Sequence, residues 1–185
     1  PPQRKHPRLR YTGEAHPPHG KDDFCKTPID FAPEHEVERD DTFAAKATEM
    51  HPVSDSRVFA AATDPEMLRE LDMPDVHILE EGHIGGLNGV LLAAALDAGM
   101  HGACLLGEMP QIFIQVPYPK ASLAVLRVFA QIADFALDFS ELQKESKTVD
   151  SELGKIVSKL EQRLQRDTSD KSEEFDKSEE FGIVE

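Results

Sequence analysis

The 185-residue sequence contains no tryptophan and only two cysteines, and aromatic side chains make up 6% of it. Cys25 lies in a polar stretch and Cys104 in an apolar run, which excludes a framework of disulfides and favours a reducing, cytoplasmic environment. No apolar run approaches the roughly 18 to 20 residues that a membrane-spanning helix needs. The sequence therefore predicts a cytoplasmic protein without a membrane anchor.

Positive charge is also scarce, because 20 lysines and arginines face 35 aspartates and glutamates, for a formal net charge of −15. Nucleic acids and anionic membrane surfaces attract basic proteins, so neither is an expected partner. A protein partner or a second copy of the chain is compatible with an acidic surface.

Composition divides the chain into three parts. Residues 1–56 hold eight of the thirteen prolines and five of the eight histidines and show no sustained periodicity, so we predict an irregular segment with at most a short helix at 42–50. Residues 57–166 have the patterns of an α/β domain. Residues 167–185 contain a tandem six-residue acidic repeat, Asp-Lys-Ser-Glu-Glu-Phe, which predicts a disordered tail.

Within 57–166, three short apolar runs at 57–63, 76–79 and 102–107 predict strands, and 66–71, 88–98 and a segment that opens at Pro119 predict helices. The order strand, glycine-rich turn, helix, strand predicts a parallel crossover. Ser140 and Gln143 have the spacing of a capping box for a helix over 140–165. This helix carries an apolar stripe that predicts a seam for another helix, from the same chain or a second copy: Leu142, Val149, Leu153, Ile156, Leu160 and Leu164.

The glycine-rich turn at 82–89, Gly-His-Ile-Gly-Gly-Leu-Asn-Gly, precedes a predicted helix, where backbone N–H groups can hold an anion. It lacks the Gly-x-Gly-x-x-Gly spacing and the Gly-Lys-Ser/Thr of the common phosphate loops, so close packing is the competing interpretation. Asn88 would cap the helix or orient a ligand. Acidic residues follow two strands that we expect to end at one sheet edge. The candidate ligand-binding residues are Glu81, Gly82, Gly85, Gly86, Asn88, Gly89 and Glu108.

Catalytic motifs are missing from the pattern. The sequence has neither a Gly-x-Ser-x-Gly elbow nor a His-Glu-x-x-His motif, and Cys104 lies in an apolar strand that would keep its thiol inert. His16, His19, Cys25 and His35 fit no zinc spacing, so we expect no metal and no cofactor. An enzyme is not the favoured interpretation.

The motifs at 57–64, 80–89, 103–110 and 119–126, in this order, resemble the PAC2 family, which includes relatives of proteasome assembly chaperones. The resemblance covers residues 57–165. It implies a three-layer α/β/α sandwich of the phosphorylase/hydrolase-like type and members that assemble as dimers or larger rings. Family members usually open with a strand–helix half that residues 1–56 do not resemble, so the chain is either truncated or has an incomplete sheet whose edge a partner covers.

Two functions follow from these observations. The favoured one is a non-catalytic interaction module of the assembly-chaperone type, which self-associates as a homo-oligomer or binds another protein. The alternative is a binder of, or an enzyme acting on, a small phosphate- or carboxylate-bearing molecule held by the turn at 82–89.

Overall fold

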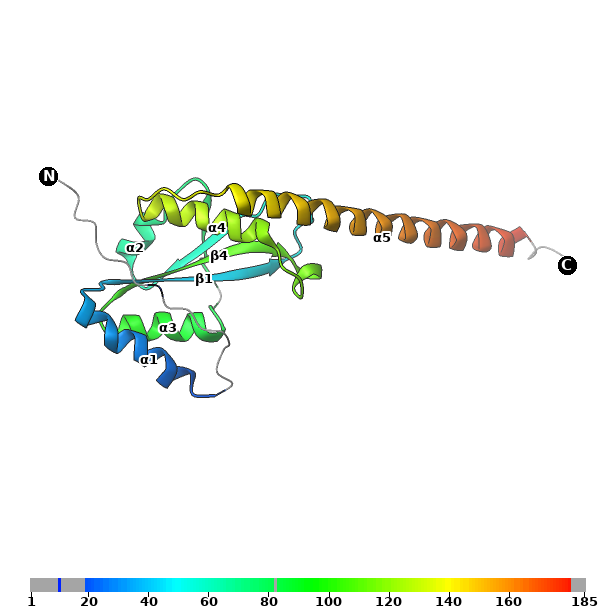
Figure 1. Cartoon of the computed structure of the whole chain (residues 1–185). Coiled ribbons are helices and arrows are strands. Elements are labelled where there is room, and N and C mark those ends of the chain that lie inside the picture. Colours follow the sequence, from blue (N-terminus) through cyan, green and yellow to red (C-terminus); the bar gives the residue numbers. More distant parts are fainter. Residues whose placement is uncertain (1–9, 11–18, 82, 181–185) are drawn as a thin grey trace.

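The computed structural model describes the fold of residue 10 and of residues 19–81 and 83–180, with side chains as far as residue 163. Within these residues the chain forms a four-stranded sheet with helices on both faces (Figure 1). The elements in chain order are α1 (Lys21–Phe31), the 3-10 turn η1 (Ala32–His35), β1 (Arg39–Thr48), β2 (Val58–Ala62), α2 (Pro65–Glu70), β3 (Val76–Ile78), α3 (Gly86–Asp97), β4 (His101–Pro110), the 3-10 turn η2 (Gln111–Phe113), α4 (Pro119–Ile132) and α5 (Ser140–Glu180).

The predicted three-layer α/β/α sandwich is confirmed. Helix α3 packs on one face of the sheet with α1 outside it, and α4 packs on the other face with α5 along it (Figure 1). The main core lies between the sheet and α4, where Leu105, Val125 and Val128 are buried together. At Gly107 on β4, an added Cβ would lie 2.6 Å from the carbonyl oxygen of Ala121, so α4 approaches the sheet closely because this residue is glycine.

The strands lie in the order β1-β4-β2-β3, and the sheet is mixed. β1 pairs with β4 in parallel along ten residues, whereas β2 is antiparallel to β4 and parallel to β3. The predicted parallel crossover from β3 to β4 is therefore wrong, because β3 runs parallel to β2 and β2 runs antiparallel to β4. β4 does have a parallel neighbour, but it is β1, which comes from the part of the chain predicted to be irregular.

The prediction that residues 1–56 are irregular is wrong over 21–35 and 39–48, which form α1, η1 and β1, whereas 49–56 contain no helix or strand. The segment predicted as a short helix belongs to strand β1, and α1 packs against α3 through Cys25 and Ile29, both buried. Thr42 is buried and Phe43 exposed, as neighbouring residues of a strand are. Pairing with the buried strand β4 overrides the helical preference of the alanines in this segment. Residues 1–9 and 11–18 lie outside the described residues.

Helix α5 departs from the prediction at both ends. Ser140 does not form the capping box, because its hydroxyl donates to Asp138 Oδ1 at 2.6 Å, and the same oxygen accepts the Ser140 N–H. The helix then continues to Glu180, so the predicted end at 165 and the disordered tail are wrong over 167–180. No glycine or proline occurs between Lys155 and Phe181, and extending an existing helix costs little. Residues 181–185 lie outside the described part of the chain.

No helix among the described residues is both long enough and apolar enough to span a membrane.

Candidate functional site

The glycine-rich turn has two glycines whose conformation or packing excludes a side chain. Gly86, the first residue of α3, has a φ of +71°, in the left-handed region that glycine tolerates best. At Gly89 an added Cβ would collide with the carbonyl oxygen of Ile84. Close packing therefore explains part of the glycine pattern. Gly82, another candidate, lies outside the described residues.

Asn88 does not cap α3. The helix begins two residues earlier, at Gly86, and its N-cap residue Gly85 offers no side-chain hydrogen bond. The Asn88 side chain instead donates from Nδ2 to the carbonyl oxygen of Phe43, at 3.1 Å. This bond ties the start of α3 to β1, an edge strand of the described sheet.

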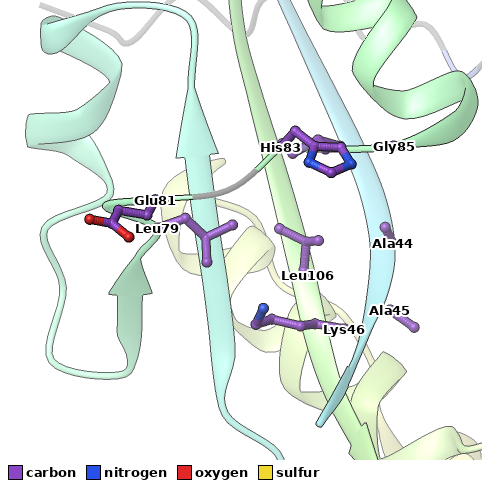
Figure 2. A pocket seen from close by; sticks show the side chains of 9 residues that line it. Ala44, Ala45, Lys46, Leu79, Glu81, His83, Gly85 and Leu106 are labelled. Carbon is purple, nitrogen blue, oxygen red and sulfur yellow. The ribbon is translucent and has the colours of Figure 1, made fainter. Parts of the chain in front are cut away.

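A pocket of about 250 Å³ lies beside the turn and includes two of the predicted residues, Glu81 and Gly85 (Figure 2). Figure 2 shows Lys46 extending from β1 across β4, below His83 and Gly85. Lys46 is not among the predicted ligand residues, because its segment was predicted to be irregular. In the sequence this residue is marked only as a single lysine in an alanine-rich run. The full lining is Ala44, Ala45, Lys46, Leu79, Glu81, His83, Ile84, Gly85 and Leu106.

Glu108, the last of the predicted ligand residues, does not line this pocket. β3 and β4 run in opposite directions, so their C-terminal ends lie at opposite ends of the sheet. The prediction that Glu80 and Glu81 lie at the same end of the sheet as Glu108 is therefore wrong. Glu108 is 1% exposed and accepts three hydrogen bonds: two from Arg57, at 2.6 and 2.7 Å, and one from Thr48, at 2.7 Å. The bonds from Arg57 lower the pKa of Glu108 to about 2. Glu108 and Arg57 form a structural ion pair.

The apolar stripe of α5 is divided between two environments. Leu153 and Val157 are buried against Met109, Phe113 and Tyr118. Ile156 and Leu160 remain 49% exposed. Of the other stripe residues, Leu142 and Val149 are half-buried, and the side chain of Leu164 lies outside the described residues.

Two loops meet α5 beside its exposed residues. Phe113 of η2 packs on Leu153 and Val157, Tyr118 donates to the carbonyl oxygen of Pro52 at 3.3 Å, and His51 lies 3.6 Å from Glu161. Both loops carry exposed aliphatic side chains, of which Ile112 is 66% exposed. We call these residues, together with the exposed ones of α5, the α5 exit surface: Val53, Ile112, Ile114, Val116, Ile156 and Leu160.

The cysteines and histidines form no reactive cluster within the part of the chain that the structure describes, where no group of three or more metal-ligating side chains occurs. Cys104 is a buried thiol, as predicted, and burial raises its pKa. Cys25 is also buried, although its neighbours in the sequence are polar, and burial raises the pKa of its thiol as well.

Comparison with known proteins gives one consistent result. The uncharacterized protein MJ1210 of Methanocaldococcus jannaschii is 31% identical over 109 residues, which are 58% of this chain and 41% of the relative. Pyrococcus furiosus PbaA, an archaeal homolog of proteasome-assembly chaperone, superposes with a TM-score of 0.66 at 24% identity, over 86% of this chain and 65% of PbaA.

Two further solved structures are similar. Pyrococcus furiosus PbaB, described as an archaeal proteasome activator, matches with a TM-score of 0.65 at 26% identity, over 76% of this chain and 60% of PbaB. A PAC2 family protein from Streptomyces avermitilis has a TM-score of 0.68 at 24% identity, over 76% of this chain and 58% of that protein. The chain thus spans less than two thirds of each of these relatives.

The sequence profile of the PAC2 family matches residues 3–157, so the match begins well before residue 57, where the resemblance in the sequence was first apparent. It includes α1 and β1, which complete the observed sheet and its outer helical layer. On the strength of this match and of the shared fold, the chain belongs to the PAC2 family.

Proposed function

We propose that this chain is a non-catalytic protein-interaction module of the assembly-chaperone type and that the α5 exit surface binds its partner. The supporting observation is the concentration of exposed aliphatic side chains where α5 leaves the domain. Clusters of this kind on a protein surface mark interaction sites, because covering them removes apolar area from water.

The length of α5 supports the same function. The helix lies along α4 and then continues past the edge of the sheet (Figure 1). Residues 162–180 would span about 28 Å as a helix. In proteins most of the stability of a helix comes from packing one of its faces against another element. A second protein chain packed beside it would stabilise it and would cover Ile156 and Leu160 at the same time.

The relatives suggest the class of partner. PbaA is described as a homolog of proteasome-assembly chaperone and PbaB as a proteasome activator. We therefore propose a proteasome subunit as the partner protein and a cytoplasmic location for the complex. A second copy of this chain is the other occupant that the surface would accept, and the test below distinguishes it from a proteasome subunit by mass.

The test is light scattering coupled to size-exclusion chromatography, on the chain alone and mixed with purified proteasome subunits from the same organism. We expect a complex that the double variant Ile156→Asp/Leu160→Asp no longer forms. Both residues are half-exposed, so this variant should keep its fold. The control, Ser158→Asp, introduces the same kind of negative charge at an exposed α5 position between them and should bind normally.

Three results would separate the possibilities. A larger mass for the chain alone, lost in the double variant, would identify self-association through this surface. A complex with the proteasome subunit that survives the double substitution would place the interaction elsewhere. A monomer that binds no proteasome subunit would overturn the proposal.

A further inference from the structure

Two cations lie over one aromatic ring on the sheet face near the turn. Lys46 Nζ is 5.3 Å and Arg57 Cζ is 5.2 Å from the ring centroid of Phe59. The three residues come from β1, from β2 and from the position just before β2, and strand pairing brings them together across β4. Cation–π contacts favour each cation separately but do not cancel the repulsion between them.

Only one of these cations is neutralised. Arg57 pairs with Glu108, at 2.6 Å. Among the residues that the structure describes, no carboxylate lies within 4 Å of Lys46 Nζ. Glu81, which lines the same pocket, turns its carboxylate away from Lys46 (Figure 2). The face therefore keeps one uncompensated, partly buried positive charge in a chain whose net charge is −15.

The pocket gives an anion space to reach this charge. Lys46 lines it together with His83 and Gly85, a histidine ring and the backbone just before α3. Asn88 leaves the start of α3 free of a side-chain cap, because it bonds to Phe43 instead. The volume of about 250 Å³ is below that of most drug-sized ligand sites, so it suits a group of few atoms.

We propose that this pocket binds the phosphate or carboxylate group of a small molecule, with Lys46 as its principal counter-ion. The bound anion pairs with the Lys46 ammonium and takes the place of the carboxylate partner that the described part of the chain does not supply. The site is separate from the α5 exit surface and does not depend on the protein-binding function proposed above. Arg57 stays paired with Glu108 and keeps its own cation–π contact with Phe59.

The test is a titration of the full chain, monitored by two-dimensional amide NMR. The ionic strength is kept constant, because salt screens exposed charges. The two probes are inorganic phosphate and malonate, a small dicarboxylate. We expect saturable shifts of the His83 and Gly85 amides with at least one probe. Response to phosphate alone would assign a phosphate site, and response to malonate alone would assign a carboxylate site.

The deciding variant is Lys46→Met, which keeps the aliphatic stem over Phe59 and removes the charge. Binding should weaken about tenfold or more, the factor that 1.4 kcal/mol represents. Lys159→Met, the control on exposed α5, should bind as the unmodified chain does. The proposal is overturned if neither probe gives saturable shifts, or if Lys46→Met keeps its fold by thermal melting and binds unchanged.

Discussion

Removing Arg57 should destabilise the domain more than removing the charge of Glu108, although the two residues form one ion pair. The pair is asymmetric, because the Arg57 side chain is 54% exposed and that of Glu108 is 1% exposed. In Arg57→Met the carboxylate stays buried and loses both guanidinium hydrogen bonds, so that Thr48 is the side-chain donor that remains. In Glu108→Gln the guanidinium turns to water and the amide still accepts from Thr48.

The magnitudes follow from what each change leaves unpaired. A buried charge left without its partner costs about 3–5 kcal/mol. Replacing a charged acceptor by a neutral one of the same shape costs about 1–2 kcal/mol, the difference between charge-assisted and ordinary hydrogen bonds. We expect Arg57→Met to reduce the free energy of unfolding by about 2 kcal/mol more than Glu108→Gln does. Urea unfolding followed by circular dichroism at pH 7 measures both.

The pH dependence of the free energy of unfolding tests the same reasoning. In the unmodified chain the pKa of Glu108 falls from its usual 4.5 to about 2 on folding, so its contribution to stability is present above pH 4.5 and is lost as the pH falls towards 2. In Arg57→Met, burial without a cation should raise this pKa above the unfolded value, so the loss caused by the substitution should shrink as the pH is lowered. Equal losses for the two variants, or a loss in Arg57→Met that does not shrink in acid, would refute this account.

Two further perturbations test the turn and the start of β4. Gly89→Ala should lower the melting temperature clearly more than Gly85→Ala, because a Cβ meets the Ile84 carbonyl at the first position and open space at the second; similar melting temperatures would contradict the packing interpretation. His101 Nδ1 lies 3.0 Å from Asp64 Oδ2, which raises the His101 pKa, so this pair should stabilise the fold at pH values below the ordinary histidine pKa and cease to do so as the pH rises through the folded one. His101→Gln should remove this part of the pH profile of thermal stability, and an unchanged profile would show that the pair contributes nothing.

Local signals predicted the elements whose chemistry is local. The helix predicted at 66–71 is α2, which follows Pro65, and its N-cap Asp64 accepts from the N–H groups of Glu66 and Met67. The short apolar run at 76–79 likewise predicted β3 from neighbouring residues alone. These residues determine their structure within a few positions of the chain.

Pairing over long distances in the sequence was not predictable in this way. β1 is a strand because it pairs with β4, about sixty residues later, and its alanines suggest a helix when they are considered alone. The mixed sheet has the same origin, since nothing in the order of elements shows that β2 separates β3 from β4. The missed strand β1 left Lys46 out of the predicted ligand residues, and the mistaken direction of β4 relative to β3 placed Glu108 among them.

Both proposed sites include residues that the sequence singled out. The turn at 82–89 does border a pocket, but the basic residue that the sequence seemed to lack comes from β1. The predicted apolar stripe lies on α5, and its division into buried and exposed residues depends on η2, whose packing no periodicity reveals.

Hydrogen–deuterium exchange of the chain with and without a bound proteasome subunit tests the central claim, that the α5 exit surface is the binding surface. We predict slower exchange at residues 111–116 and 156–160 in the complex, with no change at residues 83–89. A complex that forms while residues 111–116 and 156–160 exchange as fast as in the free chain would contradict the claim.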